Sequence, residues 1–399
     1  MVRAGFSRER LGKVTATLQG YVDREEVAGV VSLVWRRGEV AQVDALGWRD
    51  DAARVPMDRA TLFRIASMTK PVTSVAVMML AEEDRLRLDA PVAEWLPELA
   101  SPRVLREPGG PLDVTDPARE PITVLDLLTH RAGLAYHFTA LGPLSDAYLN
   151  VFNGLEPRGR NEAWFARMAQ LPLMFQPGAR WHYSVATDIL GVLVQRVSGL
   201  SLGEFFRTRI FEPLGMRDTA FWVHESQLNR FATAYAIDPD TRRRVVEDHP
   251  SASRWANPDR FQGGGGGLVS TIDDYLRFAR MLLNRGRLDD VRLLSHRSVD
   301  LMRCNFLSRE QRRMPSLGNV SWAGQGFGLG LSIVDEPAQQ LALGYRSAGS
   351  FGWPGAYGTT WFADPVEDMI ALMMIQRRSI DAFPMAIDFE RRVYEAIDD

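Results

Sequence analysis

Hydrophobic positions near the two ends of the chain follow the pattern of β-strands. Residues 28–35 are almost all apolar or β-branched, and residues 40–48 form a second such run after a turn at Arg37-Gly38. Together these two runs predict an antiparallel hairpin. Further strands are predicted near the C-terminus over residues 328–334, 358–363 and 369–375, followed by a helix over residues 384–397.

The middle of the chain has a helical pattern instead. From about residue 89 to residue 248 the sequence indicates helices divided by Pro and Gly, and strand signals are sparse. Helices are predicted there over residues 124–128, 161–170, 186–197 and 202–211. Outside this block we expect helices over residues 11–21, from about Ser67 onward, and over residues 272–284, the last one capped by Ser270 or Thr271.

The order of these elements predicts an α/β fold with a helical insertion. An antiparallel β-sheet formed by both termini and flanked by helices would carry an inserted all-helical lobe. We therefore expect residues 1–88 and 249–399 to form an α/β sandwich domain and residues 89–248 a helical domain.

Composition and charge narrow the class of protein. With 399 residues, of which 46% are hydrophobic and 24% charged, the chain is typical of a globular protein with a sizeable core. A net charge of -3 indicates neither nucleic-acid nor membrane-surface binding. No apolar run is long enough to span a bilayer and no signal peptide is recognised, so we expect a cytoplasmic protein.

The single cysteine, Cys304, is predicted to be a buried thiol. The histidines lack metal-binding spacing, so we expect no metal and no cofactor. The sequence carries no signal for an oligomeric state.

Candidate chemistry begins at Ser67-Met68-Thr69-Lys70. Positions three apart on a helix share a face, so Ser67 and Lys70 can meet there. Pro71 is tolerated only in a first turn, which places the start of the helix near Ser67. A serine at a helix N-terminus, with an amine one turn along to take its proton, is a nucleophile pair. Because Ser-x-x-Lys also occurs by chance on solvated helices, the pair needs partners elsewhere in the chain.

Two later stretches could supply these partners. Residues 176–184 form a turn that ends in Trp181-His182-Tyr183-Ser184, with Ser184 as a candidate cap for the helix that follows. Held there, the phenol of Tyr183 could exchange a proton with Ser67, although a packing role is the more common fate of a tyrosine. Residues 350–358 contain Gly352, Gly355 and Gly358 ahead of a predicted strand. Glycines at such an edge allow a close approach, and a backbone N–H there could point at an oxyanion.

The order of these motifs resembles the serine β-lactamase and penicillin-binding-protein superfamily. Within it, the chain is most similar to the class C β-lactamase-like esterases, the family VIII carboxylesterases. The resemblance covers nearly the whole chain and includes residues 128–134 (Leu-Thr-His-Arg-Ala-Gly-Leu) and residues 265–271 (Gly-Gly-Gly-Leu-Val-Ser-Thr). It implies an α/β domain and a helical domain with the active site between them, in agreement with the fold predicted above.

The resemblance also implies roles for matching residues. Ser67 would be acylated by an ester, Lys70 and Tyr183 would manage its proton, and water would release the acid. Either Lys70 or Tyr183 could be the acylation base. The oxyanion hole would consist of the Ser67 N–H and the Ala356 N–H, if residues 353–355 match the Lys-Thr-Gly of β-lactamases. In the alternative register residues 347–349 take that place, and Ser350 supplies the second N–H.

Two positions depart from the β-lactamase pattern, and both are expected to contact substrate together with Gly355. Trp353 stands where those enzymes have a cation for a substrate carboxylate, and Val185 stands where they have an asparagine. The site would therefore suit a neutral ester better than a charged amide.

A rival esterase signature is Gly199-Leu200-Ser201-Leu202-Gly203, which fits Gly-x-Ser-x-Gly. That motif requires a strand before the serine, whereas a helix is predicted here, and Ser201 with Glu204 is typical of a helix cap.

Taken together, the motifs predict a serine esterase that hydrolyses carboxylic esters with small to medium acyl groups through an acyl-enzyme on Ser67, with a small-molecule ester and water as its partners. The alternatives are a β-lactamase or D,D-peptidase, an acyltransferase on the same scaffold, and a non-catalytic binding protein.

Overall fold

The computed structural model describes residues 4–152, 161–314, 322–339, 345–378 and 383–399. Its main sheet has eight strands in the order β12-β13-β14-β15-β16-β1-β2-β3, and all neighbouring pairs are antiparallel. The N-terminal strands are β1 (Gly29–Arg36), β2 (Glu39–Asp50) and β3 (Val55–Pro56). The C-terminal strands are β12 (Gln325–Phe327), β13 (Ser332–Val334), β14 (Phe351–Gly352), β15 (Thr360–Asp364) and β16 (Met369–Met374). Both ends of the chain thus build one sheet, joined where Leu33 of β1 faces Leu372 of β16.

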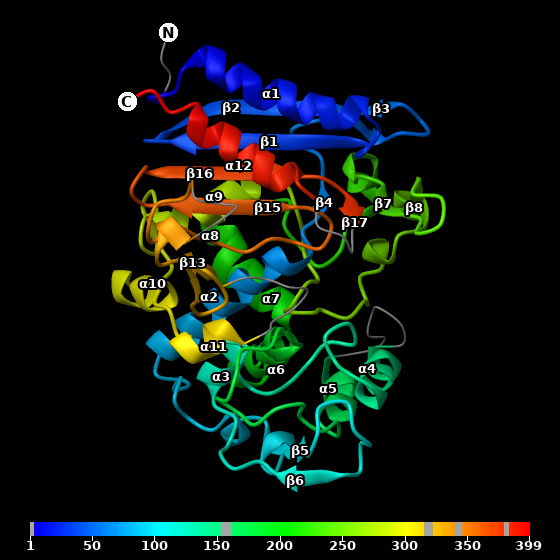
Figure 1. Ribbon diagram of the computed structural model, residues 1–399, viewed down its shortest axis with the longest axis vertical. Coiled ribbons are helices and arrows are strands. Elements are labelled where there is room, and N and C mark those ends of the chain that lie inside the picture. The colour runs from blue at the N-terminus through cyan, green and yellow to red at the C-terminus, as the bar shows by residue number, and fades with distance from the viewer. Residues whose placement is uncertain (1–3, 153–160, 315–321, 340–344, 379–382) are drawn as a thin grey trace.

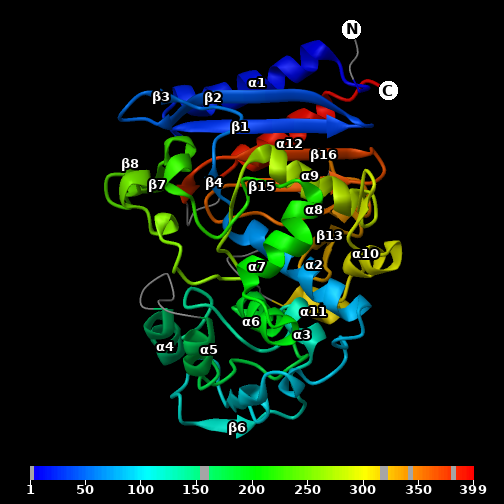
Figure 2. The ribbon, with the colours of Figure 1, turned by 180° about the vertical axis from the view of Figure 1, so that it is seen from behind.

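Helices cover both faces of this sheet. On one face α1 (Arg8–Asp23) and α12 (Met385–Glu395) pack side by side over β1, β2 and β16, and the two termini lie close together there (Figure 1). On the other face α9 (Ile272–Leu283) packs against β15 and β16, as the view from behind shows (Figure 2). Every residue of β1 is buried, which explains its continuous apolar run. The predicted fold class is confirmed.

The helical part of the chain surrounds α2 (Thr69–Glu82), whose residues 69–80 are all buried. The neighbouring helix α6 (Ala186–Ser198) packs along α2. The other helices of this part are α3 (Val124–Leu128), α4 (Pro143–Phe152), α5 (Asn161–Met168), α7 (Leu202–Phe206) and α8 (Glu212–Leu214), with a π-helical segment Arg207–Phe211 between the last two. Two short helices, α10 (His296–Met302) and α11 (Arg309–Arg313), follow α9. No single helix among the described residues is long and apolar enough to cross a membrane, although α6 and the segment from Leu202 to Leu214 pass that test as a bent pair.

Several short strands were absent from the predicted pattern. They form the pairs β4 (Phe63–Arg64) with β9 (Val269–Ser270), β5 (Arg103–Leu105) with β6 (Thr115–Pro117), and β10 (Arg287–Leu288) with β11 (Val291–Arg292). A three-stranded sheet joins β7 (Ala234–Ile237) and β8 (Arg244–Asp248) to β17 (Arg377–Arg378). This last sheet ties residues 234–248 to the C-terminal part of the chain. The division into domains at residues 89 and 248 stays a prediction.

Local differences from the predicted elements have physical causes. The strand expected over residues 328–334 is interrupted, because Gly330 has a φ of +79° and the N–H of Gly328 bonds to Leu331 in a tight turn between β12 and β13. The prediction that Cys304 is buried is wrong. It follows the end of α10 and is exposed, with its thiol near the carbonyl of Asp300.

Candidate active site

Ser67 lies in a short 3₁₀ turn (Ala66–Met68) that leads into α2. Ala66 adopts a φ of +44°, an unusual conformation for a residue with a side chain, and one that clusters at functional sites. The turn is held from both sides: β4 pairs with β9, and the hydroxyl of Tyr275 donates to the carbonyl of Met68 at 2.8 Å. Ser67 is thereby fixed, partly exposed, at the entrance of a buried helix.

Lys70 is 1% exposed, and its Nζ contacts two oxygens. The Nζ donates to Ser67 Oγ at 3.2 Å and to the carbonyl of Gly265 at 2.6 Å. It also lies 4.6 Å from the centre of the Tyr183 ring, within the range of a cation–π contact. The three-residue spacing across the start of α2 thus brings Lys70 to Ser67 as expected. The glycine run at residues 263–267 also passes close to the site, through the Gly265 carbonyl.

Tyr183 reaches Ser67 from the segment that precedes α6. Its hydroxyl donates to Ser67 Oγ at 2.7 Å, so the two oxygens meet across 116 positions of sequence. The backbone around it is fixed, since Thr139 Oγ1 donates to the Tyr183 carbonyl and the N–H of His182 donates to the carbonyl of His130. The cap of α6 is Val185, one residue later than expected, while Ser184 Oγ accepts from the N–H of Ala186.

Two histidines beside this segment are kept neutral by burial. Burial, with a smaller effect from the Lys70 charge, holds the pKa of His130 well below its usual value. Burial also lowers the pKa of His182 to about 4. Neither imidazole therefore adds positive charge next to Lys70 at neutral pH.

A tyrosine–aspartate pair that the sequence reasoning missed supports Lys70. Tyr136 donates from its hydroxyl to Asp188 Oδ2 at 3.2 Å, and the N–H of Gly265 donates to Asp188 Oδ1 at 2.9 Å. The peptide whose carbonyl holds Lys70 is therefore itself anchored by Asp188. Burial, and next the charge of Asp188, raises the pKa of Tyr136 well above its usual value, so this phenol stays protonated. The signal in the sequence that could have pointed to this pair was Asp188 itself, an acidic residue in the first turn of the largely apolar helix α6.

The C-terminal motif comes close to the serine turn. Trp353 lies against Tyr183, with ring centres 5.5 Å apart and its Nε1 3.5 Å from the tyrosine hydroxyl. A Cβ added to Gly355 would meet the carbonyl oxygen of Ile65 at 2.3 Å, so only glycine allows this approach of the two backbones. Ala356 lines the same pocket as Ser67.

The remaining predicted positions lie elsewhere. Residues 347–349, the alternative register, contact the last residues of β13 and β15. The N–H of Gly349 donates to the Val334 carbonyl, and the N–H of Ser347 donates to Asp364 Oδ2. Val185 is fully buried in the main core and does not line the pocket. Its expected contact with substrate, like the roles of the other site residues, stays a prediction.

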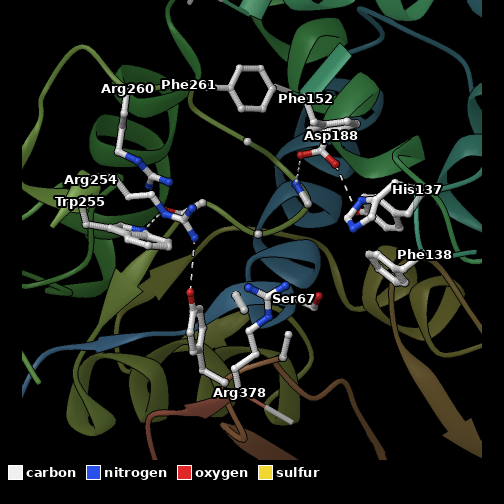
Figure 3. A pocket seen from close by; sticks show the side chains of 18 of the residues that line it. Ser67, His137, Phe138, Phe152, Asp188, Arg254, Trp255, Arg260, Phe261 and Arg378 are labelled. Carbon is white, nitrogen blue, oxygen red and sulfur yellow. Dashed lines mark hydrogen bonds between the residues drawn. The ribbon is translucent and has the colours of Figure 1, made fainter. Parts of the chain in front are cut away.

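A pocket of about 200 Å³ opens above Ser67. Aromatic and cationic side chains line it, with Arg254 and Arg260 on one side and His137 and Phe138 on the other (Figure 3). The lining Phe, Tyr and Trp residues are Tyr136, Phe138, Phe152, Tyr183, Trp255, Phe261 and Tyr357, and the lining arginines are Arg254, Arg260 and Arg378. Phe138 is 54% exposed, which places it at the mouth.

The rival serine has no such surroundings. Ser201 follows α6, not a strand, and caps α7 by accepting from the N–H of Glu204 at 3.2 Å. It lines a separate cavity of about 600 Å³. The strand–serine–helix elbow that Gly-x-Ser-x-Gly requires is therefore absent at Ser201. Among the described ranges no group of three His, Cys, Asp or Glu is placed to hold a metal ion.

The fold agrees with the family comparison. The Beta-lactamase family model matches residues 14–394, so the chain belongs to the β-lactamase family, as the sequence resemblance predicted. Esterase EstB of Burkholderia gladioli is 32% identical over 380 residues, which cover 91% of this chain and 89% of EstB. An uncharacterized protein of Mycobacterium tuberculosis is 47% identical over 372 residues, 92% of this chain and 91% of that protein.

A solved structure extends the likeness to three dimensions. That structure is titled "EstCE1, a hydrolase with promiscuous acyltransferase activity"; it superimposes with a TM-score of 0.80 at 28% identity, covering 97% of this chain and 99% of EstCE1. With family, fold and esterase relatives in agreement, the chain is a serine hydrolase.

Proposed function

We propose that this protein is a carboxylesterase that works through an acyl-enzyme on Ser67. The observation that carries the proposal is the position of Ser67 Oγ, within hydrogen-bonding distance of both Lys70 Nζ and Tyr183 Oη, in the lining of a pocket. A nucleophile in contact with two groups that can exchange protons is the arrangement that covalent ester hydrolysis needs.

In the acylation step Ser67 Oγ attacks the ester carbonyl carbon and passes its proton to Tyr183 or Lys70, whichever is deprotonated. Both groups are close enough for that transfer, at 2.7 and 3.2 Å. The tetrahedral oxyanion is stabilised by the N–H groups of Ser67 and Ala356. The C–O bond to the alcohol then breaks, and the alcohol leaves with the proton. Water attacks the acyl-enzyme by the same route in reverse and releases the acid and free Ser67.

Support for the second oxyanion donor comes from the close packing of the two backbones that would carry the donors. Gly355 lies against Ile65, two residues before Ser67, and the hydroxyl of Thr359 donates to the same Ile65 carbonyl at 3.3 Å. This contact keeps Ala356 at a fixed distance from the serine turn. The register that includes residues 353–355 is the one we propose.

Acyl transfer is a second candidate, because the similar structure EstCE1 is described as a hydrolase with promiscuous acyltransferase activity. Transfer uses the same acyl-enzyme and replaces water by an alcohol. Adding a primary alcohol to the assay and measuring the ratio of transferred ester to free acid separates the two activities.

The test of the esterase proposal compares two serine variants on nitrophenyl esters of acetate, butyrate and octanoate, with a chromogenic cephalosporin in parallel. Ser67→Ala should abolish ester hydrolysis and leave folding intact, whereas Ser201→Ala should keep most of the activity. An active Ser67→Ala variant with an inactive Ser201→Ala variant would refute the proposal. A cephalosporin turned over as fast as the butyrate ester would favour the β-lactamase alternative.

A further inference from the structure

Aromatic rings are the commonest side chains in the lining of the pocket beside Ser67. Seven Phe, Tyr and Trp side chains are among the described residues that line it, and four lining glycines add no side chain to it. We propose that the physiological substrate is an ester with one aromatic ring, which lies in this pocket while the ester carbonyl carbon faces Ser67. This proposal rests on the esterase function of Ser67 proposed above and names the substrate class of that site. A neutral ring also agrees with the neutral ester expected from Trp353 and Val185.

The charged side chains of the lining already have partners within the protein. Asp188 accepts the two hydrogen bonds described above. Arg260 donates to two backbone carbonyls at 2.9 and 2.7 Å, and Arg254 donates to a lining phenol at 3.4 Å. Arg378 is paired with Glu247, with 2.5 Å between Nη1 and Oε1. The rings are therefore what the lining mainly offers to a substrate.

Two phenyl rings lie in the part of the pocket away from the nucleophile. Figure 3 shows Phe152 and Phe261 on the opposite side of Asp188 from Ser67. Both rings pack against the fully buried indole of Trp164, with ring centres 5.6 and 5.0 Å apart and planes inclined at 62° and 54°. Aromatic pairs prefer such distances and inclinations. Because Trp164 belongs to the main hydrophobic core, it holds the two phenyl rings in place, and a substrate ring can meet them in the same geometry.

A third phenyl ring stands at the mouth of the pocket. Phe138 is 54% exposed, and its ring stacks on that of Tyr136 with centres 5.0 Å apart and planes 10° apart. The ring of Tyr136 in turn lies 5.3 Å from that of Tyr183, whose hydroxyl contacts Ser67. The aromatic lining thus extends from the solvent to the reacting serine. A substrate that covers the exposed ring gains free energy, since burial of apolar surface is favourable.

The size of the pocket suits a single ring. An apolar cavity of about 150 Å³ holds a benzene molecule. At about 200 Å³ this pocket has room for one ring and a short linker to the ester. A fused two-ring system or a long alkyl chain would leave part of its surface in water and lose the corresponding burial free energy.

Contacts between rings distinguish an aromatic substrate from a saturated one of the same size. A cyclohexyl group is at least as large as a phenyl group and more apolar, so burial alone favours the saturated ring. Edge-to-face and stacked contacts favour the aromatic ring, by about two- to tenfold in an equilibrium or rate constant. A preference for phenyl over cyclohexyl therefore reports contacts with the aromatic lining.

Matched esters test the proposal. The acyl pair is methyl phenylacetate and methyl cyclohexylacetate, and the alcohol pair is benzyl acetate and cyclohexylmethyl acetate. Each kcat/KM is divided by the rate constant for alkaline hydrolysis of the same ester, which removes differences in intrinsic reactivity. We expect the aromatic member to be favoured at least about twofold in one pair, and that pair identifies the part of the ester that lies in the pocket.

The size limit is tested with the naphthyl analogue of the favoured ester. Its kcat/KM should fall below that of the phenyl ester, because the second ring extends beyond the pocket. A naphthyl ester that is hydrolysed faster than the phenyl ester would overturn the assignment of a single ring.

Leucine variants then locate the effect. Phe152→Leu and Phe261→Leu keep an apolar side chain and remove the ring, so each should lower the aromatic-to-saturated ratio toward one. The control is Tyr345→Leu, which removes a 39% exposed ring outside the pocket and should keep the wild-type ratio. Wild-type ratios below about twofold in both pairs, or ratios unaffected by both pocket variants, would overturn the proposal. In either case Ser67-dependent hydrolysis of the saturated esters would leave the esterase function standing.

A measurement on the wild-type enzyme covers the case in which the pocket variants fail to fold. Phenylacetamide and cyclohexylacetamide are neutral amides that match the acyl pair, and N-benzylacetamide and N-(cyclohexylmethyl)acetamide match the alcohol pair. Their inhibition constants are compared against hydrolysis of methyl butyrate. We expect the aromatic amide to inhibit at least about twofold more strongly in the pair that matches the preferred esters. Equal inhibition within both pairs would count against a pocket for an aromatic ring.

Discussion

Replacing Gly355 by alanine should test whether the close approach of two backbones sets up the reaction. An added Cβ at this position would lie 2.3 Å from the Ile65 carbonyl oxygen and 2.2 Å from Thr359 Oγ1. Real Cβ atoms essentially never come within 3.0 Å of such neighbours. Because Thr359 is itself fully buried, neither neighbour can move away easily.

The expected magnitude follows from this geometry. To relieve the contact, the segment that carries Ala356 must move away from the serine turn by roughly 1 Å, and a displacement of about that size can cost ~10²-fold in rate. Loss of one oxyanion donor has a similar effect, ~10²–10³ in kcat. We therefore expect kcat for nitrophenyl butyrate to fall about 10²-fold. KM should change much less, since most of the pocket lining comes from other segments. Overpacking should also lower the free energy of unfolding by about 1–3 kcal/mol.

The assay is steady-state hydrolysis at a temperature where circular dichroism shows that the variant is folded. Gly12→Ala serves as the control, because Gly12 lies in α1 and nothing comes within 4 Å of an added Cβ. That variant should keep full activity and gain up to about 1 kcal/mol in helix stability. A folded Gly355→Ala enzyme with kcat within about threefold of the wild type would show that the approach of the two backbones does not position the oxyanion hole.

Three further predictions follow from the contacts of the site. Tyr183→Phe and Lys70→Ala should each lower kcat by at least ~10²-fold, and the double variant should lose little more, because the two groups act in one proton transfer; additive losses would mean separate steps. Asp188→Ala should release the Gly265 peptide that holds Lys70 and lower kcat about tenfold with a smaller change in KM; an unchanged kcat would contradict this support. Burial lowers the pKa of His182 to about 4, so on acidification the imidazole is protonated in the unfolded state before it is protonated in the folded state. The free energy of unfolding therefore decreases as the pH falls from about 6.5 toward 4. In urea unfolding at pH 7 and pH 4.5, His182→Gln should lose less stability between the two pH values than the wild type, by up to about 2–3 kcal/mol.

Local sequence determined the parts of this protein that depend on short-range periodicity. The three-residue spacing of Ser67 and Lys70 brings both to one turn at the start of α2. Likewise, the β-branched run of residues 28–35 and its return at 40–48 specify a hairpin. Its first strand is buried on both faces and therefore requires layers above and below it. The resemblance of ordered motifs then identified the family correctly.

Tertiary packing decided which distant side chains meet. Nothing in the local pattern around Tyr136 indicates that it contacts Asp188, or that Arg378 in a two-residue strand shares a pocket with Ser67. The outward position of Cys304 was decided in the same way. Periodicity specifies which face of an element is apolar, but the neighbour of that face depends on how elements far apart in sequence pack together. The set of arginines that line the pocket is therefore a property of the folded chain, because they come from segments more than a hundred residues apart.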